Sequence, residues 1–148
     1  MTIHFIIPGD PVGKGRARVT KTGHAYTPQK TRDYEELVKL SCLAAHCPPF
    51  PKGVPIILTM IATYPIPKSA SKKRRQMMID GEILPTGKPD LSNVLKAVED
   101  GLNNGVGYYD DSQIYMEFAA KRYGERSGVE VWIDERKDSV WAAHQTGD

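Results

Sequence analysis

The amino-acid sequence predicts a single α+β domain in which helices pack on one mixed β-sheet. Three observations support this fold class. The length of 148 residues suits one domain built around one hydrophobic core. Hydrophobic residues make up 40% of the chain and charged residues 26%, which is ordinary for a globular protein. The segments also follow one another in the order strand, helix, strand, helix, helix, strand, strand, as expected for a sheet covered by helices.

Apolar β-branched runs, glycine clusters and prolines locate the elements of the N-terminal half. Thr27-Pro28 has the form of a helix start, with Thr27 as N-cap and Pro28 at the first helical position. The near-continuous apolar run VPIILTMIATY indicates a strand in the middle of the sheet. The predicted elements are a strand at 2–8, a glycine-rich loop or irregular hairpin at 9–27 that turns near 21–23, a helix from 28 to about 46, and a strand at 54–64.

Serine, aspartate and glycine residues mark the element boundaries of the C-terminal half. The predicted elements are a short basic helix capped by Ser69 or Ser71 and ending near 80–81, a helix that begins at Asp90 or Ser92 and ends near 103–105, and strands at 113–123 and 128–134. The last two strands alternate apolar and polar residues and are joined by a turn at 124–128. We therefore expect a folded domain over 1–135, followed by a partly disordered C-terminal tail over 136–148.

The charged residues are unevenly distributed, although the formal net charge is only +2. Basic residues form one cluster near the N-terminus and a second in the predicted basic helix, at Lys14, Arg16, Arg18, Lys21, Lys30, Arg32, Lys68, Lys72, Lys73, Arg74 and Arg75. Acidic residues gather elsewhere, notably at Asp90, Glu99, Asp100, Asp110 and Asp111. Two basic clusters beside an acidic pocket suit a protein that grips phosphates and holds a cation between them.

Two other classes of protein find little support. No apolar run approaches the roughly 20 residues that span a bilayer. The N-terminus also lacks the charged and apolar regions of a signal peptide, which favours a cytoplasmic protein with no membrane partner. Cys42 and Cys47 have neither CxxC nor Cys/His spacing, so we expect buried or half-buried thiols instead of a zinc site.

The helix after Pro89 has one apolar side and one functional side. At 100° per residue, the apolar side consists of Leu91, Val94, Leu95, Val98 and Leu102, and the opposite side presents Asn93, Lys96 and Asp100. A loop with two glycines would then return Asp110-Asp111 toward the same helix. Up to four carboxylates would converge, from Asp90, Asp100, Asp110 and Asp111. Such hard oxygen ligands suit Mg²⁺ or Mn²⁺, and Lys96 would add positive charge beside a phosphodiester.

Each of these residues also has a simpler interpretation. Asp90 would serve as a helix N-cap, Lys96 and Asp100 as a solvated i,i+4 pair, and Asp110-Asp111 as turn residues. Residue spacing alone favours these simpler roles, because scattered aspartates are a weak motif.

The segment from Lys88 to Gln113, KPDLSNVLKAVEDGLNNGVGYYDDSQ, resembles the RusA family of Holliday junction resolvases. The family pattern is an Asp, an Asp-Asn pair two residues on, a Lys three residues after the Asn, an Asp four further on, a glycine-containing loop and Asp-Asp-x-Gln. It maps onto Asp90, Ser92-Asn93, Lys96, Asp100 and Asp110-Asp111-Ser112-Gln113. The N-terminal part is also similar, at Gly9-Asp10-Pro11, Lys14-Gly15-Arg16, Arg18 and Tyr26-Thr27-Pro28, so that the resemblance covers about Ile3 to Ile133.

The resemblance implies a Mg²⁺-dependent endodeoxyribonuclease, with Mn²⁺ able to replace Mg²⁺, that resolves Holliday junctions in DNA recombination and repair. It also implies a homodimer, since two symmetric cuts in a two-fold junction are most simply made by a two-fold dimer. The substrate would be branched DNA and not a small molecule, and the setting a bacterial cell, with a phage or prophage origin. The implied residues are Asp90, Lys96 and Asp111 for catalysis; Asp90, Ser92, Asp100, Asp110 and Asp111 for the metal; Lys14, Arg16, Arg18, Lys72, Lys73, Arg74 and Arg75 for DNA; and Asn93 and Gln113 in support.

Ser92 departs from the family pattern, which has an acidic residue at that position. If the position supplies a metal ligand, then a hydroxyl, a water or another carboxylate such as Asp100 must take its place. This departure motivates a second hypothesis, a non-catalytic module that binds junctions or other DNA after losing part of the metal site. A third hypothesis is a globular domain with no nucleic-acid role, in which the basic clusters are simply solvated faces.

Overall fold

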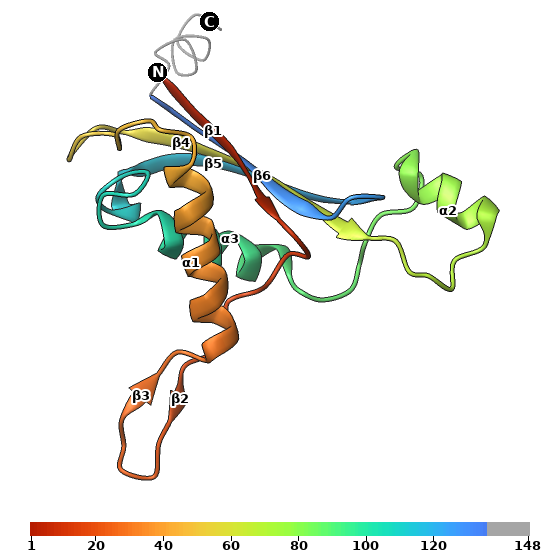
Figure 1. The fold of residues 1–148 in the computed structure, drawn as a ribbon, viewed down its shortest axis with the longest axis horizontal. Coiled ribbons are helices and arrows are strands. Elements are labelled where there is room, and N and C mark those ends of the chain that lie inside the picture. Colours follow the sequence, from red (N-terminus) through yellow and green to blue (C-terminus); the bar gives the residue numbers. More distant parts are fainter. Residues whose placement is uncertain (136–148) are drawn as a thin grey trace, which may run out of the picture.

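Four strands form the main sheet of the computed structural model, which describes residues 1–135. They are β1 (Thr2–Pro8), β4 (Ile56–Pro65), β5 (Ile114–Gly124) and β6 (Gly128–Glu135), in the spatial order β1-β6-β4-β5. β4 runs parallel to β5 and antiparallel to β6, and β1 runs antiparallel to β6. Because helices pack on this mixed sheet (Figure 1), the predicted α+β fold class is confirmed.

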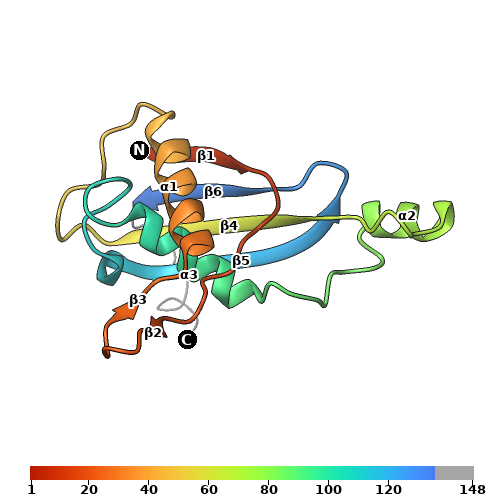
Figure 2. The ribbon, with the colours of Figure 1, turned by 60° about the horizontal axis from the view of Figure 1, so that its bottom comes forward.

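The two faces of the sheet differ in their cover. Ile3, Phe5 and Ile7 of β1 alternate with exposed residues and point into the core. β4 lies between two other strands and is buried at nearly every position, as its apolar sequence predicts. On the outer face, which no described helix covers (Figure 2), Ile6 and Phe118 are 59% and 62% exposed. The sheet therefore has one packed face and one open, partly apolar face.

Helices α1 (Gln29–Leu43) and α3 (Leu91–Leu102) lie side by side on the packed face of the sheet (Figures 1 and 2). The amphipathic pattern of α3 explains its orientation, because Val94, Ala97, Val98, Gly101 and Leu102 are buried. A Cβ added at Gly101 would lie only 2.7 Å from Cβ of Val38 on α1. Glycine at this point lets the two helices approach closely, which brings the polar residues of α3 beside those of α1.

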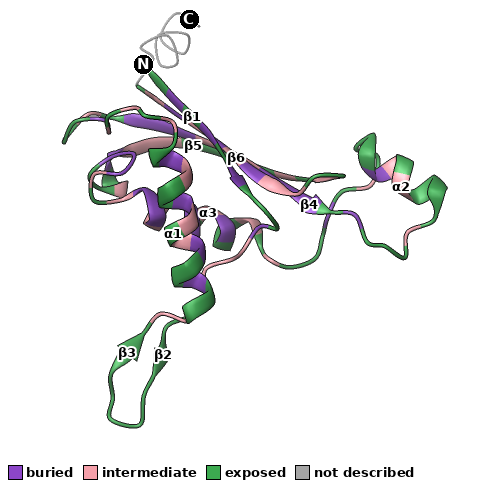
Figure 3. Cartoon of the chain, viewed as in Figure 1, coloured by how far each residue is buried: buried purple, intermediate pink, exposed green. Residues whose placement is uncertain are grey.

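Two small elements project from this body. Strands β2 (Arg18–Val19) and β3 (Ala25–Tyr26) form a hairpin before α1, as the predicted turn near 21–23 requires. Helix α2 (Lys72–Ile79) projects on another side of the molecule (Figures 1 and 2). Its N-cap is Ser71, whose hydroxyl accepts a hydrogen bond from the backbone N–H of Arg74 at 3.2 Å, so the second of the two predicted caps is the right one. Figure 3 shows that the hairpin is almost wholly exposed, whereas α2 is exposed in its first turn and buries Met78 near its end.

The structure corrects several predicted boundaries. Pro28 is the N-cap of α1 and not its first helical residue, and the helix ends at Leu43, three residues before the predicted end. A short 3₁₀ helix, η1 (Asp111–Gln113), precedes β5 and was not predicted. Cys42 is buried and Cys47 half-buried, and both are free thiols, as expected. The predicted tail at 136–148 lies outside the described residues. Within residues 1–135, no helix has the length and apolar character needed to cross a membrane.

Candidate active site

Helix α3 presents the predicted functional face to the exterior. Ser92, Asn93 and Lys96 are exposed, and Asp100 is half-buried, while the apolar residues of the helix face the core. The backbone N–H of Lys14 donates to the carbonyl of Asn93 at 2.9 Å, which fixes the N-terminal loop against α3. The side of α3 that carries Asn93, Lys96 and Asp100 thus borders the basic N-terminal loop.

A chain of ion pairs joins four segments at this face, the N-terminal loop, α1, α3 and η1. The ammonium group of Lys14 lies 2.6 Å from Oδ2 of Asp100 and 2.8 Å from Oε1 of Glu35 on α1. The ammonium group of Lys96 lies 3.2 Å from Oδ1 of Asp100 and 3.3 Å from Oδ2 of Asp111. Both carboxylate oxygens of Asp100 are therefore engaged by lysines. The contact between Lys96 and Asp111 brings together the two halves of the motif, which lie 15 residues apart in the sequence.

These contacts hold both lysines in the charged state. Burial acts to lower the pKa of Lys14, but hydrogen bonds from its ammonium group to Asp100 and Glu35 outweigh that effect and raise the pKa. The pKa of Lys96 is raised in the same way, since its bonds to Asp100 and Asp111 outweigh partial burial. Lys96 therefore offers a fixed positive charge at the surface of α3.

The Asp-Asp-x-Gln segment owes its shape to Gln113. The side-chain oxygen of this buried residue accepts hydrogen bonds from the backbone N–H groups of Tyr109 and Asp110, at 2.9 and 3.1 Å. Its side-chain nitrogen donates to the carbonyls of Pro51 and Val54, at 2.9 and 3.0 Å. The loop before η1 is thereby tied to the segment before β4.

The two aspartates of this segment differ in their surroundings. Asp110 caps η1, because its carboxylate accepts from the backbone N–H of Ser112 at 2.9 Å, and these bonds lower its pKa. Asp111 is half-buried and directs one oxygen to Lys96. Residue spacing alone did not distinguish the two residues, although the family resemblance implied a catalytic role for Asp111 only.

Asp90 stands apart at the start of α3. It is the exposed N-cap residue, and its carboxylate makes no hydrogen bond or ion pair with any residue of 1–135. Asp100 follows ten residues later, about 15 Å further along the helix axis. Within the described part of the chain, no three Asp, Glu, His or Cys side chains are grouped closely enough to hold a metal ion. The expected convergence of Asp90, Asp100, Asp110 and Asp111 on one cation is therefore not seen.

Glu99 and Glu117 form an acidic pair beside this site that the sequence analysis missed. Burial and, next, the neighbouring carboxylate of Glu117 on β5 together raise the pKa of Glu99 to about 8. The charge of Asp111 acts in the same direction, and that of Lys96 opposes it. Helical spacing would have placed Glu99 on the flank of α3, but nothing in the sequence indicates that Glu117 lies beside it.

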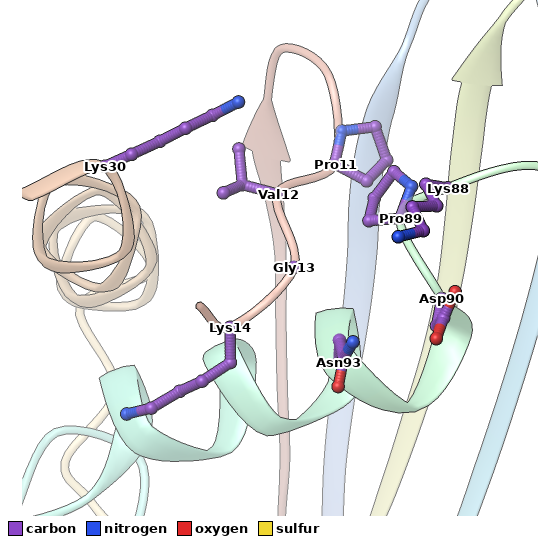
Figure 4. A pocket seen from close by; sticks show the side chains of 9 residues that line it. All are labelled: Pro11, Val12, Gly13, Lys14, Lys30, Lys88, Pro89, Asp90 and Asn93. Carbon is purple, nitrogen blue, oxygen red and sulfur yellow. The ribbon is translucent and has the colours of Figure 1, made fainter. Parts of the chain in front are cut away.

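The predicted DNA-binding residues fall into two groups. Arg16, Arg18, Lys72, Lys73 and Arg74 are exposed on the hairpin side and on α2, and Arg75 lies 3.8 Å from the exposed Glu125. Lys14 differs, because its ammonium group is held by Glu35 and Asp100. Two further lysines, Lys30 and Lys88, line a cavity next to Asp90 (Figure 4) and were not among the predicted DNA contacts.

Comparison with known proteins gives two matches. The model of the family described as Endodeoxyribonuclease RusA matches residues 8–134. A protein of Bacillus subtilis (strain 168), described as "Uncharacterized protein YqaN", is 36% identical over 138 residues, which cover 90% of this chain and 96% of the relative. The family match begins at the end of β1 and extends over both packed helices, β4, β5, nearly all of β6 and the Asp90–Gln113 segment.

Proposed function

Because the chain belongs to the RusA family of endodeoxyribonucleases, we propose that it is a Mg²⁺-dependent enzyme that resolves Holliday junctions. The observation that carries the proposal is the contact between Lys96 and Asp111, which joins the two parts of the motif at one face of α3. A lysine and carboxylates at the surface, flanked by exposed basic elements, suit the cleavage of a polyanionic backbone.

Asp90 and Asp111 are the residues that would hold the metal ion. The free carboxylate of Asp90 and the second oxygen of Asp111 support this assignment, since Mg²⁺ commonly takes one or two carboxylates together with waters and substrate phosphates. The chemistry of these two carboxylates suits Mg²⁺, or Mn²⁺ in its place, with waters and substrate phosphates as the other ligands. Asp100 and Asp110 are less suitable as metal ligands. Both oxygens of Asp100 are paired with lysines, and the carboxylate of Asp110 caps η1. The hydroxyl of Ser92 is available as a weak additional donor.

The metal ion would supply an activated water and stabilise negative charge on the phosphate. Lys96 would then place an ammonium group beside the reacting phosphate, where positive charge stabilises the transition state more than the ground state. Asp100 acts as a positioning residue for Lys96, and Lys14 neutralises the remaining charge of Asp100.

Two copies of the chain would act together. A four-way junction has two-fold symmetry, so a two-fold dimer presents one active site to each of two opposite strands. The open face of the sheet supports this proposal, because it exposes large apolar side chains on both edge strands, Ile6 on β1 and Phe118 on β5, and exposed apolar groups often mark protein interfaces. We place the enzyme in the bacterial cytoplasm, where recombining DNA is found.

The proposal is tested by cleavage of a synthetic four-way junction, beside a fork and a linear duplex, with and without Mg²⁺. We expect metal-dependent symmetric nicks in the junction, which Asp90→Asn and Asp111→Asn abolish without weakening junction binding. Asp33→Asn, on the exposed side of α1, is the matched control and should cut normally. Normal cleavage by either active-site variant would show that the assigned residues are wrong.

A second candidate function is a non-catalytic junction-binding module. The observation that favours it is Ser92, an exposed hydroxyl where the family pattern has an acidic residue. Salt-sensitive binding without any cleavage in Mg²⁺ or Mn²⁺ would support the module, whereas metal-dependent nicking that Asp90→Asn abolishes would exclude it.

A further inference from the structure

A cavity of about 370 Å³ opens directly in front of Asp90 and Asn93. The N-terminal loop, the first turn of α1 and the segment before α3 form its walls (Figure 4). A second cavity, of about 350 Å³, shares four of its residues, Pro11, Lys30, Lys88 and Pro89. The two cavities therefore meet along a common wall, and each has the size of a small-ligand site.

Lys30 and Lys88 are the free cations of this common wall. Neither side chain makes an ion pair or a hydrogen bond with any residue of 1–135, in contrast to Lys14, which holds two carboxylates. Figure 4 shows that Lys14 directs its ammonium group along α3 and away from Asp90, whereas Lys88 lies next to Asp90. Two unpaired ammonium groups at one cavity favour an anion between them.

The second cavity has a mixed lining, in which Asp10, Lys30 and Lys88 lie beside apolar groups. Pro65, Pro67 and Pro85 contribute to it, together with the half-buried ring of Tyr123 and the edge of Tyr64. The hydroxyl of Tyr64 donates a hydrogen bond to the carbonyl of Pro89, which fixes this wall relative to the start of α3. Flat apolar groups next to an anion site match a nucleotide, which joins a phosphate to a sugar and a planar base.

The wall between the N-terminal loop and α3 is also closely built. A Cβ added at Gly13 would lie 3.0 Å from Cβ of Pro89 and 3.1 Å from Cβ of Asn93. The backbone hydrogen bond from Lys14 to Asn93 holds the same two segments together. The first cavity is therefore bounded by fixed backbone, next to the carboxylate proposed to bind the metal.

We propose that these adjacent cavities bind one nucleotide of the cleaved DNA strand, next to the scissile phosphate. Lys30 and Lys88 hold its phosphate, and the Tyr123 and proline side of the second cavity receives its sugar and base. The inference rests on the proposed function for the identity of the polymer, and it adds a positioning site that sets where the strand is cut relative to the branch point.

The test is a double-mutant cycle that combines protein variants with modified DNA, and only the binding affinity is measured. Junctions carrying a single neutral methylphosphonate at successive positions around the branch point are titrated with the full-length protein in EDTA. We expect one position to weaken wild-type binding by about three- to tenfold, as for the loss of a charge-assisted contact. Lys30→Gln and Lys88→Gln should each weaken binding to unmodified DNA to a similar extent. The methylphosphonate at that position should then cause no further loss of affinity in either variant.

Matched variants separate this effect from a general loss of charge. Lys39→Gln, also exposed on α1, should remain sensitive to the same methylphosphonate, and Lys30→Arg should behave like wild type. The inference would be overturned if, for both Lys30→Gln and Lys88→Gln, the loss of affinity from the variant multiplied with the loss from the methylphosphonate at every position tested. The result is distinguishable from a failure of the proposed function, because the absence of nicking in Mg²⁺ leaves the binding cycle in EDTA readable.

Discussion

At the scale of single residues, Gln113 shows how a motif residue acts without touching substrate. Its side chain makes four hydrogen bonds that join the 109–110 backbone to Pro51 and Val54. Asp111 lies two residues before it and faces Lys96. Gln113 therefore determines where the second half of the motif meets α3.

Replacing Gln113 with alanine should leave buried backbone groups without partners. We expect Gln113→Ala to lower the free energy of unfolding by about 2–4 kcal/mol, since each unsatisfied buried group costs roughly 1–3 kcal/mol and water replaces part of the loss. Junction cleavage should fall by more than junction binding. Urea denaturation and cleavage assays test this, with Ser112→Ala as the control at an exposed neighbour. Unchanged stability would refute the anchoring role.

The acidic pair of Glu99 and Glu117 makes stability depend on pH. The pKa of Glu99 is about 8 in the folded protein against 4.5 ordinarily, so the folded state retains a proton that the unfolded state has lost between these values. Stability should therefore fall as the pH rises from about 5 through 8.

Glu99→Gln removes this titrating group and should reduce the loss of stability between pH 5 and pH 8.5. After allowance for solvent screening, we expect a difference of about 1 kcal/mol between pH 5 and pH 8.5, or ~2–4 °C in Tm. Glu36→Gln, an exposed change on α1, should leave the wild-type pH dependence intact. An equal change in Tm between the two pH values for Glu99→Gln and wild type would contradict the raised pKa of Glu99.

The residues that could be predicted from sequence are those whose partners are local. Asn93, Lys96 and Asp100 share a helix face because 3.6-residue periodicity puts them there. The partners of Lys14 could not be predicted, since Glu35 and Asp100 come from two helices whose packing depends on the whole fold. Capping by Asp110 was likewise hidden, because its local turn resembles many others.

At the scale of elements, the approach of α1 and α3 depends on Gly101. Its missing side chain leaves room for Val38 and for the carbonyl of Glu35, which would lie 2.7 Å and 2.9 Å from an added Cβ. This contact also fixes how Glu35 and Asp100 meet Lys14. Packing of the core and assembly of the polar site are therefore linked at one residue.

Gly101→Ala should force the two helices apart. Although alanine favours a helix by about 1 kcal/mol relative to glycine, overpacking costs about 1–3 kcal/mol, and the backbone contact makes relief difficult. We expect a net loss of stability in thermal denaturation together with reduced cleavage. Gly87→Ala is the control for stability, because an added Cβ there meets no atom within 4 Å. Equal or higher stability of Gly101→Ala would contradict this account.

The strands and helices themselves were largely predictable, and the errors lie at their ends. The apolar run of β4 and the alternation of β1 and β6 specify strands directly. The end of α1 was misplaced because residues 44–46 have no strong helix breaker until the prolines that follow. The parallel pairing of β4 with β5 could not be read from sequence, since strand order depends on how α3 crosses the sheet.

At the scale of the whole molecule, the basic hairpin β2–β3 and helix α2 project from different parts of the body (Figures 1 and 2). Neither element contributes a residue to the hydrophobic core cluster, although α2 buries Met78. Their positive charge and their separation on the molecule suit a protein that contacts several arms of a branched DNA.

Removing the charge of α2 should change binding through salt dependence. For Lys72→Gln, Lys73→Gln and Arg74→Gln combined, the slope of log Kobs against log salt should become shallower by about 0.9 for each lost phosphate contact. Gel-shift titrations at several salt concentrations measure this slope. Lys39→Gln should leave it unchanged, and an unchanged slope in the triple variant would remove α2 from the DNA-binding surface.

The open face of the sheet provides a second prediction at this scale. Phe118→Asp would place a charge in the apolar surface proposed to join two copies, and we expect it to convert dimers into monomers in light scattering. Leu40→Asp is the control, since Leu40 is 55% exposed on α1, away from this face. A dimer that survives Phe118→Asp would locate the interface elsewhere.

The position of β6 has a consequence for synthesis of the chain. β6 is the last described strand to leave the ribosome, yet it lies between β1 and β4, and its Asp134 pairs with Thr2 across 132 residues. Until it emerges, β1 has no sheet partner and β4 has an open edge, so the nascent chain cannot complete its core. A translation product interrupted before β6 would therefore lack a complete core, and only chains that include residues 128–135 can close the sheet.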